Sequence, residues 1–274
     1  MTADPTLITG VGKRAGFHVA RAFLQRGMPV IGTYRTWYPR MEELEQFGAD
    51  LYHCDFDRQD EVDLLIGDIK ARHERLRGII HNASQWLRDD DGVPFGEVIE
   101  RMMRIHANVP YQLNHELAPL LQACRDAHAD IIHIGDYVSS RGSKKHIAYA
   151  ASKAAQDNMT LSFAAKLAPK VKVNSLAPAL IKFNEHDDPG YRQKAVAKSL
   201  MQREGGWDEL QHAIDYLFAS QYVTGRVLPL IHSRRCIRDL IDEKSPGEQR
   251  RWHDRHWSSW RWRARCVPVS RMPG

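Results

Sequence analysis

The sequence predicts an α/β fold, with one doubly wound parallel sheet of about seven strands and helices on both faces. Short apolar segments alternate along the chain with longer segments whose apolar residues recur at helical spacing. A glycine-rich turn joins the first apolar segment to the first helical one. Strands that alternate with helices favour parallel pairing through right-handed crossovers. With 274 residues the chain is long enough for one large domain of this class.

Each short apolar run that ends in a turn is expected to be a strand, and each segment with a 3.6-residue period a helix. The expected strands are residues 6–9, 29–34, 50–54, 76–81, 129–135, 171–175 and 225–229. The expected helices are residues 14–27, 39–48, 59–75, 96–124, 147–168, 189–203 and 208–220. The clearest apolar stripes join Val19, Ala20, Phe23 and Leu24 in the first helix, and Val62, Leu65, Ile66 and Ile69 in the third.

The charge of the chain is concentrated at its end. Residues 231–274 hold 11 of the 39 Lys and Arg and 5 of the 34 Asp and Glu, so this tail is +6 and the first 230 residues are −1. The nearly neutral body excludes an electrostatic argument for nucleic-acid binding. The start has no signal-peptide pattern, and no apolar run approaches the roughly 20 residues of a membrane span. The scattered cysteines indicate reduced thiols, so we expect a cytoplasmic protein.

The glycine-rich turn is a candidate dinucleotide site. It reads Thr9-Gly-Val-Gly-Lys-Arg-Ala-Gly16 and lies between the first strand and the first helix. Glycines there let the backbone approach a pyrophosphate, whose charge the helix N-terminus favours. The expected cofactor contacts in this turn are Gly10, Gly12, Lys13, Arg14 and Gly16.

The end of the second strand indicates which dinucleotide binds. A carboxylate would be expected there for the ribose hydroxyls of NAD, but the chain has Arg35-Thr36, with Lys13 and Arg14 in the nearby turn. Positive charge suits the 2′-phosphate of NADP, so the predicted cofactor is NADPH. The alternative is a solvated surface arginine. Further expected cofactor contacts follow the third and fourth strands, at Asp55, Phe56, Asn82 and Ala83.

Tyr149 and Lys153 lie one helical turn apart and are therefore on one face of their helix. The lysine charge is expected to lower the phenol pKa from about 10 and make Tyr149 a usable proton donor. Asp136 lies thirteen residues before Tyr149. A carboxylate is a poor partner for a carbonyl oxygen that gains charge and a good partner for an N–H group. The combination predicts reduction of a C=N bond and not of a C=O bond.

Together these motifs resemble the short-chain dehydrogenase/reductase family over about residues 5–230, with a Rossmann-type fold. Arg14 replaces the middle glycine of the family turn, and Asp136 the family serine. Both departures resemble the pteridine reductases, most closely the bacterial enzymes that reduce dihydromonapterin. That resemblance implies hydride transfer from NADPH to C6 of a 7,8-dihydropterin and a proton to N5, with a side activity on dihydrofolate. It also implies a homo-oligomer, a tetramer built on the helices at 96–124 and 147–168.

The resemblance also assigns roles to individual residues. Tyr149 and Asp136 would hydrogen-bond the pterin, and Lys153 the nicotinamide ribose. Tyr149 and Lys153 are therefore also expected cofactor contacts. Asn108 would hold a relay water. The pterin contacts it implies are Arg14, Ser84, Trp86, Asp136 and Tyr149. The group that protonates N5 stays open between Tyr149 and a water ordered by Arg14.

Two segments stand apart from this assignment. Residues 181–206 correspond to the lid that the family places over its substrate, with a plain solvated loop as the alternative. Residues 231–274 hold four of the seven tryptophans and lack the family ending, so we expect a reductase domain at 1–230 and an atypical, disordered or frame-shifted tail. A genuine Arg/Trp segment that binds nucleic acid or an anionic membrane surface is the other interpretation of the tail. The remaining alternatives for the whole chain are a reductase of another imine or a ketone, and a catalytically impaired NADP-binding protein. No histidine spacing resembles a metal site.

Overall fold

The computed structural model describes residues 3–199 and 201–230, and the tail predicted at 231–274 lies outside them. In the described part, seven parallel strands form one sheet in the order β3-β2-β1-β4-β5-β6-β7. The strands are β1 (Thr6–Ile8), β2 (Val30–Tyr34), β3 (Asp50–His53), β4 (Gly78–His81), β5 (Ala129–Ile134), β6 (Val171–Pro178) and β7 (Arg226–Leu230). The strand order reverses between β1 and β4, where doubly wound sheets bind their ligands.

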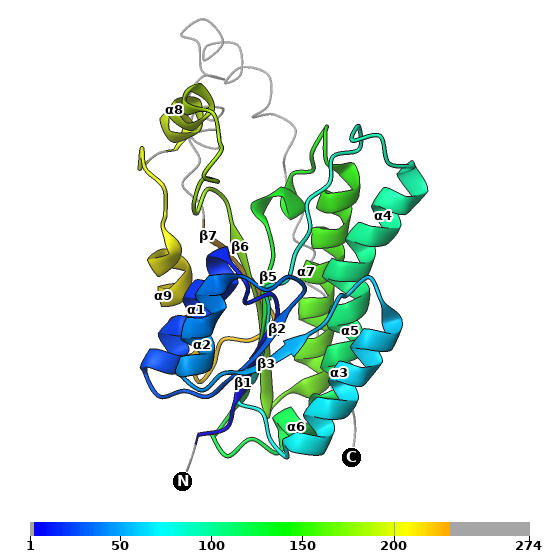
Figure 1. Ribbon diagram of the computed structural model, residues 1–274, viewed down its shortest axis with the longest axis vertical. Helices are drawn as coiled ribbons and strands as arrows, with labels where there is room; N and C mark the ends of the chain where they lie inside the picture. Colours follow the sequence, from blue (N-terminus) through cyan, green and yellow to red (C-terminus); the bar gives the residue numbers. More distant parts are fainter. Residues whose placement is uncertain (1–2, 200, 231–274) are drawn as a thin grey trace, which may run out of the picture.

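Helices cover both faces of the sheet, as predicted (Figure 1). One face carries α1 (Arg14–Gln25), α2 (Glu42–Gln46) and α9 (Trp207–Ala219). The other carries α3 (Gln59–Arg72), α4 (Phe95–Met103), α5 (Val109–Glu116) and α7 (Ile147–Leu167). The shorter α6 (Ala118–Gln122) follows α5 directly, and α8 (Pro189–Lys198) lies away from the sheet. Two 3₁₀ turns lie at Pro39–Met41 and Tyr137–Ser140.

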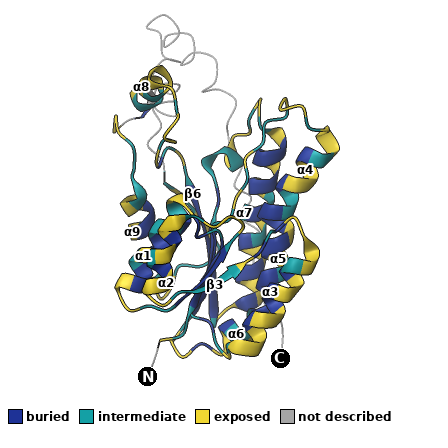
Figure 2. Ribbon diagram, in the orientation of Figure 1, coloured by how far each residue is buried: buried dark blue, intermediate teal, exposed yellow. Residues whose placement is uncertain are grey.

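Each helix layer buries the apolar stripe that its sequence predicts (Figure 2). On one face Val19, Phe23 and Leu24 of α1 pack in a cluster with Ile214 of α9. On the other, the four α3 residues of the predicted stripe pack in a cluster with Phe163 of α7 and the strand residues beneath. Because both faces are covered, the central strands are apolar on both sides, which is typical of parallel sheets.

The helix predicted at 96–124 is the place where the structure differs most from the sequence pattern. Its middle is a π-helical turn, Arg104–Asn108, between α4 and α5. Ile105, His106 and Ala107 are all buried there. Successive α-helical residues point about 100° apart, so a straight helix would spread these three over more than half of its circumference. The wider π turn lets all three lie inward, and such turns are frequent at functional sites.

None of the helices in the described ranges combines the length and apolar character that a bilayer span requires.

Candidate active site

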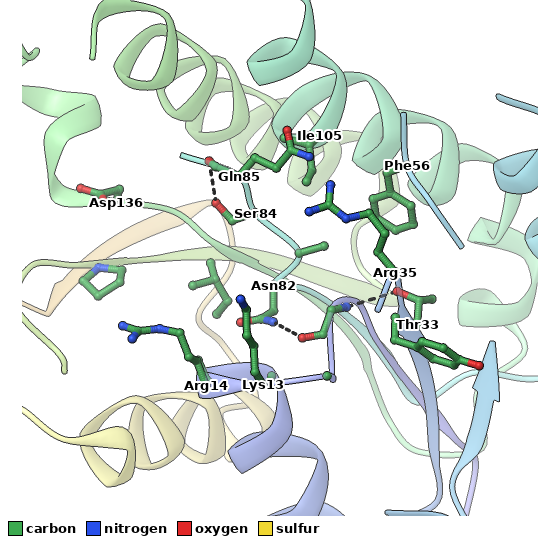
Figure 3. A pocket seen from close by; sticks show the side chains of 18 of the residues that line it. Lys13, Arg14, Thr33, Arg35, Phe56, Asn82, Ser84, Gln85, Ile105 and Asp136 are labelled. Atoms are coloured by element: carbon green, nitrogen blue, oxygen red, sulfur yellow. Dashed lines mark hydrogen bonds between the residues drawn. The ribbon is translucent and has the colours of Figure 1, made fainter. Parts of the chain in front are cut away.

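A cleft of about 420 Å³ opens at the carboxyl ends of β1, β2, β4 and β5. The glycine-rich turn and the start of α1 form one wall, and Asp136 and Ser84 lie on the opposite side (Figure 3). Arg35 and Phe56 lie at the far end from Asp136. All thirteen predicted cofactor contacts line this cleft, as do four of the five predicted pterin contacts. The exception among the pterin contacts is Trp86.

The glycine-rich turn packs too closely for side chains at two of its glycines. Gly10 has a φ of +73°, and a Cβ there would lie 2.9 Å from the Cα of Ala83. A Cβ on Gly16 would lie 2.1 Å from the carbonyl oxygen of Gly10. The Asn82 side chain donates hydrogen bonds to the carbonyl oxygens of Thr9 (2.9 Å) and Gly10 (3.1 Å), so it holds the turn onto β4. This leaves bare backbone facing the cleft, the surface that a pyrophosphate requires.

Arg14 occupies a backbone conformation that favours glycine. Its φ is +54°, in the left-handed region. Its guanidinium donates to Asn184 Oδ1 (2.6 Å) and to the carbonyl oxygen of Lys182 (3.0 Å). It also lies 5.2 Å from the ring centroid of Trp207. Arg14 therefore connects the cofactor turn to the segment predicted to be a lid, a contact that the sequence did not indicate.

The strain at Arg14 predicts a difference between two substitutions. Arg14→Gly and Arg14→Ala both remove the contacts to the lid segment, but only glycine relieves the left-handed backbone. We expect Arg14→Gly to be the more stable variant by about 1 kcal/mol in urea denaturation. Equal stability of the two variants, or a more stable alanine variant, would contradict strain at this position.

The far end of the cleft is positively charged at the end of β2. Arg35 is exposed and lines the cleft together with Thr36 and Lys13. Lys13 Nζ lies 5.5 Å from the ring centroid of Tyr38, a lining residue that the motif reasoning missed. No ion pair of Arg35 or Lys13 is recorded among the described residues, so both charges are available to an anion. The residues thus fit a 2′-phosphate.

The predicted catalytic pair forms a hydrogen-bonded group with Asp136. The Tyr149 hydroxyl donates to Asp136 Oδ2 at 2.9 Å, and Asp136 Oδ1 accepts from the backbone N–H of Val138 at 2.8 Å. Lys153 Nζ lies 5.9 Å from the Tyr149 ring centroid and donates to the carbonyl oxygen of Ile134 at 2.7 Å. The group therefore combines a proton donor, a fixed acceptor and a buried cation.

The pKa of Tyr149 moves in the direction opposite to our expectation. Burial raises it, and the charge of Asp136 and the hydrogen bond to Asp136 raise it further. The sequence argument considered the lysine and left out the burial of the phenol and the carboxylate beside it. Burial lowers the pKa of Lys153 to about 8, against the charges of Asp136 and Asp157. Tyr149 therefore remains a neutral phenol at neutral pH and is present in the form that donates a proton.

Two predicted site residues lie outside the cleft lining. Asn108 is exposed, and its Oδ1 accepts from Gln112 Nε2 at 2.6 Å. Trp86 is 60% exposed and stacks on His146, with ring centroids 4.1 Å apart. Their roles toward water and pterin stay predictions.

His106 is a site residue that sequence reasoning missed. It is fully buried in the π turn, and its ring packs edge-on against Tyr149 at a centroid distance of 5.3 Å. Its two ring nitrogens lie 2.8 Å from the hydroxyls of Ser84 and Ser152. A histidine two residues before Asn108 carries no motif of its own, so only the fold could reveal this position.

The profile of a family described as enoyl-(acyl carrier protein) reductase matches residues 10–230. The chain belongs to the short-chain dehydrogenase/reductase family. This short-chain reductase is 55% identical over 222 residues to a dihydromonapterin reductase of Klebsiella pneumoniae, covering 81% of this chain and 92% of that protein. It is 52% identical over 226 residues to a dihydromonapterin reductase of Escherichia coli K12, covering 82% and 94%.

A solved structure supports the fold of the reductase. FolM alternative dihydrofolate reductase 1 from Brucella canis, complexed with NADP, superimposes with a TM-score of 0.75 at 23% identity. The match covers 84% of this chain and 93% of that one. The family predicted from the motifs and the predicted fold class are both confirmed.

Proposed function

We propose that this short-chain reductase uses NADPH to reduce 7,8-dihydromonapterin to the tetrahydropterin, with weaker activity on dihydrofolate. The observation that most directly supports this reaction is the hydrogen bond of 2.9 Å between the Tyr149 hydroxyl and Asp136 in the cleft. A carboxylate at this position can accept from an N–H group of a pterin ring, while it would repel the charge that develops on a reduced ketone. The printed names of the two bacterial relatives support the same substrate.

Each of the cleft residues has a separate role in the proposed reaction. When bound in this cleft, NADPH would supply the hydride for C6 of the dihydropterin. Asp136 accepts a hydrogen bond from an N–H group of the pterin and so orients the ring. The neutral Tyr149 phenol delivers a proton toward N5. Lys153, held by Ile134 and the Gln156 side chain, bonds the nicotinamide ribose. The open cleft with bare glycine backbone accepts the pyrophosphate, and Arg14 lies between the cleft and the lid.

We also propose one reductase domain at residues 1–230, with residues 181–206 as the lid over the substrate. The contacts of Arg14 with Lys182 and Asn184 support a lid that responds to the occupied cleft. Exposed apolar side chains on the outer helix layer support a homo-oligomer, a tetramer by analogy with the family. They include Phe95, Ile99, Tyr111 and Leu161. Light scattering that reports a monomer would exclude this assembly.

The activity test is NADPH oxidation with 7,8-dihydromonapterin, dihydrobiopterin, dihydrofolate and a simple ketone. We expect the highest kcat/KM with dihydromonapterin, lower values with the other dihydropterins and dihydrofolate, and no turnover of the ketone. Turnover of the ketone without turnover of any pterin would overturn the proposed reaction.

Arg35 predicts the cofactor preference. Arg35→Ala should lower the preference for NADPH over NADH by about 10- to 100-fold, the value of a charge-assisted hydrogen bond. The measurement is kcat/KM for each cofactor at saturating pterin. Arg21→Ala is the matched control, because Arg21 is an α1 arginine that pairs with Glu43 outside the cleft lining. An unchanged preference in Arg35→Ala would assign the 2′-phosphate to other groups.

A further inference from the structure

A chain of hydrogen bonds runs from the cleft wall into the protein through His106. Ser84 lines the cleft and is exposed to it. Its Oγ lies 2.8 Å from His106 Nε2, and His106 Nδ1 lies 2.8 Å from Ser152 Oγ. Ser152 Oγ donates to the carbonyl oxygen of Tyr149 at 2.8 Å. His106 and Ser152 are both fully buried, so water cannot replace a missing partner.

The chemistry of this chain of bonds determines where each hydrogen lies. A carbonyl oxygen can only accept a hydrogen bond, so the single hydroxyl hydrogen of Ser152 is donated to the backbone carbonyl oxygen of Tyr149. Ser152 can therefore only accept from His106, which places a hydrogen on Nδ1. Burial lowers the pKa of His106 well below its usual value, and the charge of Lys153 lowers it further, so the ring is neutral. A neutral ring with a hydrogen on Nδ1 has a bare lone pair on Nε2.

Ser84 is consequently the donor to His106. The Ser84 hydroxyl also lies 3.3 Å from the carbonyl oxygen of Gln85 and within hydrogen-bond reach of the Tyr149 hydroxyl. A hydrogen directed at either of these would leave the buried Nε2 lone pair of His106 unpaired, which is unfavourable. With its hydrogen directed at Nε2, Ser84 presents only acceptor lone pairs to the cleft. Such an oxygen binds an N–H or amino group of a ligand and disfavours a carbonyl oxygen at the same place.

We infer, on the basis of the proposed dihydropterin reduction, that His106 is a positioning residue: it fixes Ser84 as a hydrogen-bond acceptor and so selects the N–H-bearing edge of the pterin. The π turn at Arg104–Asn108 brings His106 inward to reach both serines. The same ring packs edge-on against Tyr149, so this pair of hydrogen bonds lies beside the proposed proton donor.

The tautomer of His106 tests the inference without reference to activity. Nitrogen-15 NMR of the labelled protein, with the His106 signals assigned by comparison with His106→Asn, should show a neutral ring with its hydrogen on Nδ1. A hydrogen on Nε2 would make Ser84 the acceptor of the pair and leave its own hydrogen for the cleft. That result would overturn the inference even if the reductase turns over dihydropterins. Conversely, if the wild-type protein turned over no dihydropterin, the proposed function would be rejected. The tautomer of His106 would then still decide whether His106 fixes Ser84 as an acceptor.

Two substitutions of His106 separate its two hydrogen bonds. The side-chain amide of glutamine reaches the place of Nε2 and can still accept from Ser84, whereas that of asparagine reaches only the place of Nδ1. We expect His106→Asn to raise KM for 7,8-dihydromonapterin about three- to tenfold with kcat changed less than about twofold. His106→Gln should recover most of this loss. The Kd of NADPH should be unchanged in both variants.

A double-mutant cycle with Ser84→Ala provides the control for structural damage. If His106 acts through Ser84, the KM effect of His106→Asn disappears in the Ser84→Ala background. The same fold-change in KM in both backgrounds, or equal losses in His106→Asn and His106→Gln, would overturn the inference.

Discussion

Gly16→Ala is expected to lower the free energy of unfolding by about 3 kcal/mol, a large part of the roughly 5–15 kcal/mol of a natural domain. The added Cβ would lie 2.1 Å from the carbonyl oxygen of Gly10 and 2.4 Å from Asn82 Nδ2. Backbone and a bonded amide cannot move aside without breaking the two hydrogen bonds of Asn82 to the turn. The same displacement closes the pyrophosphate surface, so the affinity for NADPH should fall at least about tenfold.

Gly67→Ala is the matched control for that substitution. Gly67 lies inside α3, is exposed, and a Cβ there would meet nothing within 4 Å. Alanine should therefore stabilise the protein by about 0.5–1 kcal/mol. Urea denaturation of both variants, with NADPH titration, gives the comparison. If the two alanines had similar effects, the tight packing of the turn would not be a constraint on stability.

Tyr149→Phe is expected to reduce kcat by about 10²- to 10⁴-fold with little change in the Kd of NADPH. The substitution keeps the ring that packs against His106 and removes only the hydroxyl that donates to Asp136. Pre-steady-state or steady-state NADPH oxidation with 7,8-dihydromonapterin measures the loss. A residual kcat above about a tenth of the wild-type value would mean that the proton comes from another source. A water ordered by Arg14 would then be the remaining candidate.

Tyr111→Phe controls for removal of a tyrosine hydroxyl as such. Tyr111 is a half-exposed residue of α5, outside the cleft lining, and its ring contacts Phe163 and His115. Phenylalanine keeps those contacts, so kcat should be unchanged. A comparable loss in both variants would indicate a general effect on folding instead of loss of the proton donor.

The elements of the fold could be predicted from the sequence because local periodicity determines them. All seven expected strands exist within a few residues of their predicted bounds, and β6 alone is clearly longer, ending at Pro178. The stripes on α1 and α3 are buried as predicted. Residues at the carboxyl ends of parallel strands meet at one edge of the sheet, so the cleft and most of its lining followed from motif order alone.

The sequence by itself thus determined the sheet, the faces of its helices and the position of the cofactor cleft, since each depends on spacing along the chain. The tertiary structure decided which side chains meet there. Arg14 donates a hydrogen bond to Asn184, 170 residues away. Burial, and after it Asp136, reverses the expected shift in the pKa of Tyr149. The π turn that directs His106 at Ser84 has no characteristic spacing of apolar residues by which the sequence could predict it. These features depend on distances and burial between segments remote in sequence, and only folding brings such segments together.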